Sequence, residues 1–236
     1  MDIGLIVSIA AALAAAEALS LFRRPETTAG GPTDAALWAG VIGVAVGRMT
    51  ALALDDPGAL GALRDLTALR GGVEFWPGLA AGVVVLAVAA RREGVRVERR
   101  LGDLAPYGLM AAAGYQATCF VREGCFGPAV GFGISPGTGH EPVLPVEVVG
   151  AVVLIGLAAV FVSQRTHVAP MLMVAVATWS LAVQRAVVSF WLPAVGEGLT
   201  RVHRESIAMS VLGALALVAL ARRSQLRRGS TAVMTR

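Results

Sequence analysis

The sequence predicts an all-α, polytopic integral membrane protein with about seven transmembrane helices, and three observations lead to this fold class. Hydrophobic residues make up 56% of the 236 residues, charged residues make up 15%, and the mean hydropathy is +0.71. A soluble domain has about 45–50% apolar and about 25% charged residues. The apolar residues form segments near the ~20 residues that a helix needs to cross a bilayer. The composition therefore excludes a soluble domain and also a disordered chain.

Seven apolar segments are predicted to span the membrane, namely residues 3–22, 35–54, 75–90, 104–121, 146–162, 168–192 and 206–221. No basic residue precedes the first segment, and Arg23 and Arg24 follow it, which indicates a retained span instead of a cleaved signal peptide. The spans define one helical domain over residues 1–221. We expect the basic cytoplasmic tail, residues 222–236, to be disordered.

The arginines predict the orientation, because positive charge gathers on the cytoplasmic side of a membrane. All 20 basic residues are arginine; with the N-terminus outside and the C-terminus inside, 13 face the cytoplasm, 5 face outward and 2 lie within spans. The longer connections, residues 55–74, 122–145 and 193–205, then face outward. We therefore expect the function near the outer leaflet and no nucleic acid partner. Arginine suits contact with anionic phospholipid, although a GC-rich genome also favours it.

Arg48 lies within the second predicted span, where burying a charge is costly and usually functional. Gly40, Gly43 and Gly47 precede it, and small residues at such positions allow another helix to approach closely. Arg48 could hold a lipid phosphate, or it could pair with Glu17 of the first span. The sequence leaves both interpretations open.

Arg185 is the second arginine within a span, and its position in the sixth segment favours an anion as its partner. Gln184 and Ser189 lie near it along the chain, and no acidic residue is adjacent. Snorkelling of the side chain towards the outer interface is the alternative.

The start of the third span, residues 70–78, predicts irregular backbone at membrane depth. Gly71, Gly72 and a Pro-Gly pair lie in this stretch. Such backbone occurs where it lines a cavity or is buried in protein. Glu74 and Trp76 could face that cavity, or Trp76 could be an interfacial anchor beside a solvated Glu74.

Polar residues are densest around the outer end of the fourth span, residues 114–127. Gln116, Arg122 and Glu123 lie in this stretch, and a Gly-rich loop over residues 128–139 follows. These side chains are candidates for binding a charged headgroup.

Two cysteines, Cys119 and Cys125, lie in the same stretch and do not by themselves make a disulfide framework. No histidine stands at ligand spacing from them, so we expect no metal site. A catalytic cysteine would need a base, and His140 is the nearest candidate in sequence.

The outer loop before the last span ends in a group of charged residues, with Arg201, His203, Arg204 and Glu205 in succession. Ser206 follows and resembles a helix N-cap. The group is either a solvated charge cluster beside a cap, or an anion clamp with a histidine base.

Taken in order along the predicted spans, these motifs resemble those of the bacterial prolipoprotein diacylglyceryl transferase family over about residues 38–213. In that family the second span is Gly-rich and carries an arginine. Further motifs lie at the start of the third span, before the fourth span, at the end of the fourth span and before the fifth span. The family also has an arginine in the sixth span. The similar segments here are residues 43–48, 71–78, 103–106, 116–127 and 141–147, together with Arg185.

The resemblance implies an enzyme of the bacterial plasma (inner) membrane that needs no metal or cofactor. Its partners would be phosphatidylglycerol and the lipobox cysteine of a prolipoprotein signal peptide, whose thiol receives the diacylglyceryl group while glycerol-1-phosphate leaves. The expected catalytic residues are Arg185, Glu123 and His203. The expected lipid-binding residues are Arg48, Gly71, Gly72, Trp76, Gln116, Arg122, Gly127, Glu147 and Arg204.

The sequence also departs from the family pattern. Trp76 stands where the family has a histidine, and Gln116 stands where it has an arginine. Ser189 replaces the acid one turn after the sixth-span arginine, and Gly124, beside Glu123, replaces the acid of the loop. The alternative function is therefore a non-catalytic relative that binds phospholipid or a lipoprotein partner. A small transporter is a third interpretation, but the sequence lacks the internal pseudo-symmetry expected of one.

Overall fold

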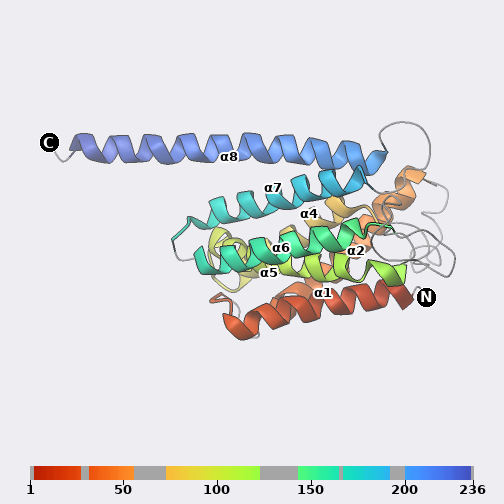
Figure 1. Ribbon diagram of the computed structural model, residues 1–236. Coiled ribbons are helices and arrows are strands. Elements are labelled where there is room, and N and C mark those ends of the chain that lie inside the picture. Colours follow the sequence, from red (N-terminus) through yellow and green to blue (C-terminus); the bar gives the residue numbers. More distant parts are fainter. Residues whose placement is uncertain are drawn as a thin grey trace.

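The protein is a bundle of helices, seen in a computed structural model that describes residues 3–27, 32–55, 73–122, 143–164, 167–191 and 200–234. The helices are α1 (Ile3–Phe22), α2 (Pro32–Asp55), α4 (Phe75–Arg92), α5 (Val97–Ala117), the 3-10 helix η2 (Cys119–Arg122), α6 (Val146–Gln164), α7 (Pro170–Ser189) and α8 (Arg201–Met234). Figure 1 shows them side by side, with α1 and α8 at opposite edges. The all-α fold class predicted from the sequence is confirmed.

Five helices are long and apolar enough to cross a membrane, and they mark the chain as a membrane protein. The apolar stretches are Ala36–Asp55, Phe75–Arg92, Val146–Gln164, Pro170–Trp191 and Arg201–Arg222. The apolar part of α1, Ile6–Phe22, is shorter. All seven predicted segments fall on helices, while the number that cross the membrane and their orientation stay predictions.

Three helices begin earlier than the predicted spans, namely α2 at Pro32, α5 at Val97 and α8 at Arg201. The first turns of α5 carry the charged residues Glu98, Arg99 and Arg100, so they do not belong to an apolar segment of the sequence. Arg100 is nevertheless buried and paired with Glu93, so these polar turns belong to the folded bundle. The helix α8 begins at Arg201, five residues before the predicted start.

The helix α8 also continues beyond the predicted last span. It runs to Met234, so residues 222–234, where we expected a disordered tail, are helical. Figure 1 shows this part of α8 extending past the ends of the other helices.

The helix α5 lies at the centre of the bundle, where it packs against α1, α4, α6 and α7. The core around it contains Leu104, Tyr107 and Leu109 of α5 with Leu154 of α6 and Leu181 of α7. The helix α2 pairs with α4, and α8 packs against α7. The bundle thus has α5 at its centre, the α2–α4 pair packed on α5 through α4, and α8 attached through α7.

Glycines bring the backbones of α2 and α4 into direct contact. A Cβ added to Gly43 would lie 2.8 Å from the carbonyl oxygen of Gly78, and one added to Gly78 would lie 2.7 Å from that of Gly43. A Cβ on Gly47 would lie 2.6 Å from the carbonyl oxygen of Glu74. The predicted close approach is therefore confirmed at Gly43 and Gly47. It is wrong at Gly40, where nothing lies within 4 Å, because that residue is on another face of the helix.

Polar contacts hold the segment after α1 against the start of α5. The backbone N–H and the hydroxyl of Thr27 each donate a hydrogen bond of 2.8 Å to Asp103. The Tyr107 hydroxyl donates to the carbonyl of Arg23, and Arg23 donates to the carbonyl of Val162 at 3.3 Å. Asp103, which belongs to one of the motifs resembling the family, thus has a structural role at this end of the bundle.

The glycine contact predicts a difference between two substitutions on one helix. We expect Gly43→Ala to lower the free energy of unfolding by about 1–3 kcal/mol, because the new methyl group meets backbone that cannot move aside. Gly40→Ala should cause no loss, since open space surrounds that position. Unfolding in detergent micelles, followed by circular dichroism, measures both variants. Equal losses of unfolding free energy in Gly43→Ala and Gly40→Ala would contradict the packing of α2 on α4.

Candidate functional site

Four helices contribute to one end of the bundle, which we call the site end: α4 and α8 begin there, and α2 and α7 end there. Arg201, the first residue of α8, connects three of these helices. Its Nη1 donates to Glu74 Oε1 at 2.8 Å, and its Nη2 donates to Asp55 Oδ1 at 2.6 Å. Glu74 is the N-cap residue of α4, and Asp55 is the last residue of α2. The first turn of α8 is therefore held against both helices (Figure 1).

Arg185 of α7 stacks on an aromatic ring at the start of α4. Its guanidinium carbon lies 4.0 Å from the centroid of the Phe75 ring, which is a cation–π contact. Phe75 in turn packs edge-to-face against Trp76, with ring centroids 5.0 Å apart. Glu205 of α8 lies within electrostatic reach of Arg185, and its carboxyl group neighbours that of Glu74. The sequence shows no acid adjacent to Arg185, but the fold supplies one from another helix.

Arg48 of α2 is buried, and the residue before it contacts the same short segment of α4. The carbonyl oxygen of Gly47 accepts a 3.1 Å hydrogen bond from the backbone N–H of Glu74. Glu74 and Phe75 are consecutive, so the start of α4 contacts the backbone of α2 at Gly47 and the Arg185 side chain of α7. The two helices that carry the predicted span arginines therefore meet at one segment.

Several buried hydrogen-bond donor atoms at the site end have no acceptor among the described residues, and two of them belong to uncharged side chains. These two are Trp76 Nε1, on a side chain that is 9% exposed, and the hydroxyl of Ser206, which is 0% exposed. An unsatisfied buried donor costs about 1–3 kcal/mol. Burial of Trp76 argues against an interfacial anchor, and Glu74 is paired instead of solvated. Ser206 is not an N-cap, since α8 begins at Arg201.

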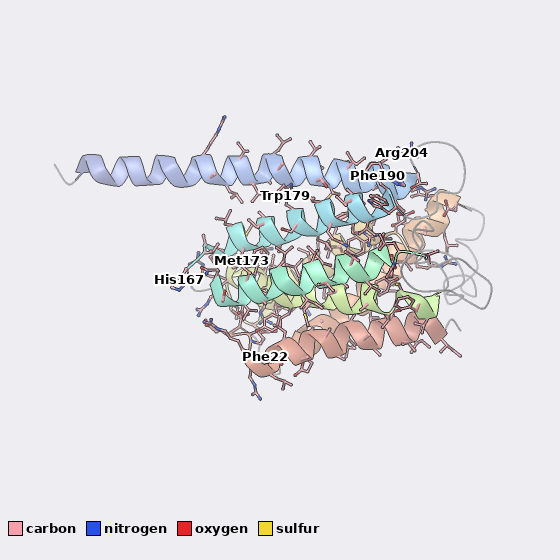
Figure 2. All side chains as sticks on the ribbon, in the orientation of Figure 1. Phe22, His167, Met173, Trp179, Phe190 and Arg204 are labelled. Carbon is pink, nitrogen blue, oxygen red and sulfur yellow. The ribbon has the colours of Figure 1, made fainter. Side chains whose placement is uncertain are left out.

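His203 is buried between α7 and α8. Its Nδ1 is hydrogen-bonded to the hydroxyl of Thr200, and its ring lies edge-on to Phe190 with centroids 4.9 Å apart. Arg204, one residue further, is exposed at the same end, as Figure 2 shows together with Phe190. Of these two predicted site residues, only His203 is held in a fixed position by neighbouring side chains.

Gln116 of α5 forms two side-chain hydrogen bonds with Gln184 of α7. Gln116 Nε2 donates to Gln184 Oε1 at 3.1 Å, and Gln184 Nε2 donates to Gln116 Oε1 at 2.9 Å, so two buried amides satisfy each other. Gly150 of α6 makes room for the pair, because a Cβ there would lie 2.1 Å from Gln184 Nε2. The lipid-binding role expected for Gln116 stays a prediction, and the partner Gln184 was not expected.

The remaining predicted site residues lie at the edges of the described structure or outside it. Glu147 is in the first turn of α6 and is half-buried. Arg122 ends η2, and its side chain is not described. Glu123, Gly71, Gly72 and Gly127 lie outside the described residues.

Cys119, at the start of η2, is buried and disulfide-bonded. The two cysteines do not by themselves predict a disulfide framework, so this bond adds to the sequence interpretation; the other cysteine, Cys125, lies outside the described residues. Thr118 donates a 2.9 Å hydrogen bond to Ser8 near the start of α1, so this disulfide is at the end of the bundle where α1 begins. No group of three metal-ligating side chains occurs in the part of the chain that the structure describes.

The comparisons with known proteins assign no family. The chain matches none of the family models, and no curated protein matches it significantly. Membership of the diacylglyceryl transferase family therefore stays a prediction that depends on the motifs.

The glutamine pair predicts a non-additive effect on stability. We expect Gln184→Leu to lower the free energy of unfolding by about 1–3 kcal/mol, because it leaves the buried amide of Gln116 unsatisfied. The double variant Gln116→Leu, Gln184→Leu should cost less than the two single losses combined, since it leaves no lone amide. Chemical unfolding in micelles tests this, and strictly additive losses would exclude the mutual pairing.

Proposed function

We propose that the protein is a membrane enzyme of the prolipoprotein diacylglyceryl transferase type, which moves a diacylglyceryl group from phosphatidylglycerol to a lipobox cysteine. The observation that carries the proposal is the contact of Arg185 with Phe75 at the start of α4, where the residue before it, Glu74, is hydrogen-bonded to Gly47, the residue before Arg48. Both arginines come from spans predicted to cross the bilayer, where cationic groups usually have a functional partner. The order of the motifs along the sequence supports the same activity.

The chemistry of the site end suits a phosphodiester. The start of α4 presents backbone N–H groups and the positive end of the helix dipole, which favour an anion. Glu74, at the N-cap, makes no capping hydrogen bond, and its carboxylate is engaged by Arg201. Trp76 Nε1 and the Ser206 hydroxyl are buried donors that a lipid headgroup could satisfy. These groups support binding of an anionic phospholipid.

The proposed transfer follows from these groups. The lipobox thiolate attacks the carbon of the diacylglyceryl group that is bonded to a phosphate oxygen. A carbon–sulfur bond forms, the bond between that carbon and the phosphate oxygen breaks, and glycerol-1-phosphate leaves. Arg48 and Arg185 would stabilise the charge on the leaving phosphate. The thiol proton must pass to a base, because the thiolate is the nucleophile. His203 is our candidate for the base; in the tautomer in which Nδ1–H donates to the Thr200 hydroxyl oxygen, Nε2 is free to take up the proton.

We place the site end at the outer leaflet of the bacterial plasma membrane. The arginine distribution favours this orientation. Structural disulfides persist in oxidising compartments, so the disulfide at Cys119 supports it independently. Figure 1 shows that α1 begins and α8 ends at opposite ends of the bundle, which fits an odd number of crossings.

A second candidate function is binding of phospholipid without transfer. Gln116 stands at the family's arginine position, and its side-chain amide is hydrogen-bonded to Gln184 and not to a ligand. Trp76 stands at the family's histidine position and cannot act as a base. These two residues favour a non-catalytic relative that presents or senses lipid.

Transfer in a defined membrane tests the proposal. We expect the protein in phosphatidylglycerol nanodiscs to add a diacylglyceryl group to a synthetic lipobox peptide, detected by mass spectrometry. Arg185→Gln should lower the rate at least about 100-fold, because it removes charge stabilisation of the leaving phosphate. Arg99→Gln, which breaks a 3.5 Å ion pair with Glu26 at the opposite end of the bundle, is the matched control and should retain activity.

The same experiment separates the two candidate functions. Binding of phosphatidylglycerol that depends on Arg185, with no transfer to the peptide thiol, would favour the non-catalytic relative. Transfer that Arg185→Gln leaves unaltered would refute the role of this arginine, and absence of both binding and transfer would refute the proposed function.

A further inference from the structure

We propose that Arg201 is a positioning residue for lipid binding: by bridging Asp55 and Glu74 it holds the start of α4 so that Phe75 stays against the Arg185 guanidinium. This inference rests on the proposed function, since it assumes that Arg185 binds the lipid phosphate. It gives Arg201 a role different from the anion clamp that the sequence suggests.

The geometry of Arg201 is that of a bridge between two helices. Separate nitrogens of one guanidinium donate to separate carboxylates, at 2.8 Å to Glu74 and 2.6 Å to Asp55. The side chains of Arg201, Asp55 and Glu74 are 36%, 62% and 15% exposed, respectively. The pair with Glu74 is therefore the shielded one, and it should contribute more than the exposed pair with Asp55. Both cationic nitrogens are occupied by protein carboxylates.

Among the described residues, the bridge connects helices that pack mainly on other neighbours. The helix α8 packs against α7, and α4 packs against α2 and α5. Arg201 thus joins the α7–α8 pair to the α2–α4 pair at the site end, together with the Arg185–Phe75 contact and the proximity of Glu205 to Glu74.

The position of Glu74 affects Arg185 because the next residue, Phe75, contacts the Arg185 guanidinium. Arg201 holds the carboxylate of Glu74, and Phe75 is the next residue, with its ring 4.0 Å from the Arg185 guanidinium carbon. The carboxyl group of Glu205 neighbours that of Glu74, and Arg201 offsets the negative charge of both. Removing the guanidinium would take away the partner that holds the Glu74 carboxylate, which would let Glu74 and the Phe75 ring beside it shift away from Arg185.

A double-mutant cycle on lipid affinity tests this inference. The proteins are wild type, Arg201→Gln, Phe75→Leu and the double variant, each in nanodiscs with phosphatidylglycerol as the titrated ligand. We expect Arg201→Gln to weaken binding about fivefold in wild type and less than about twofold in Phe75→Leu, because the coupling passes through that ring. Arg201→Lys should give an intermediate loss, since one ammonium cannot reproduce the fork of a guanidinium.

Controls separate positioning from loss of fold. Arg99→Gln removes an exposed ion pair at the opposite end and should leave the affinity unchanged. Each variant must keep the unfolding midpoint of the wild type within experimental error. If Arg201→Gln does not fold, Glu74→Gln removes the shielded partner and should show the same dependence on Phe75.

Each outcome decides between explanations. Equal losses from Arg201→Gln in both backgrounds would mean that Arg201 only stabilises the fold, and no loss at all would also overturn the inference. In either case a loss of affinity in Arg185→Gln would leave the proposed function standing. Affinity that is unaffected by Arg185→Gln would instead refute the role of Arg185 in lipid binding, and absence of both binding and transfer in the wild type would overturn the proposed function itself.

Discussion

The direct backbone contact between α2 and α4 is the interaction on which the site depends. Lipid gives no hydrophobic driving force for helix association, so close packing of small residues must supply it. The mutual contact of Gly43 and Gly78 brings the two helices together, and one turn further Gly47 accepts a hydrogen bond from the Glu74 N–H. This fixes the start of α4, and with it the ring of Phe75 that Arg185 stacks on.

Buried polar groups occur at both ends of the bundle, and at both ends their partners satisfy them only in part. Where α5 begins, Arg100 pairs with Glu93 and Asp103 accepts two hydrogen bonds from Thr27, while Arg100 Nε meets no acceptor among the described residues. At the site end Arg201 is satisfied by carboxylates, and Trp76 Nε1 and the Ser206 hydroxyl meet no acceptor among the described residues. The site end thus adds uncharged buried donors, whose burial is costly unless a ligand or water completes them.

Much of the fold was predictable from the sequence because long apolar segments have few ways to fold other than as helices in a membrane. The early starts of α5 and α8 were missed, since Arg100 and Arg201 count as polar in the sequence but are neutralised by partners in the structure. Within the site, Arg48 and Arg185 could be singled out by their position in apolar segments. Their neighbours could not, because the contacts join distant parts of the chain: Arg201 and Glu74 are 127 positions apart.

The glutamine pair limits where the function can lie. An arginine at position 116 would bring a charge into the centre of the bundle, whereas Gln116 and Gln184 form a neutral pair in which each amide satisfies the other. Gly150 leaves space for these two amides, and a larger residue there would displace them. No net charge is therefore available at this position to attract a phosphate. In the proposed function the charge for an anion therefore comes from arginines elsewhere, and Arg185, in contact with the start of α4, is the one whose position depends on that helix.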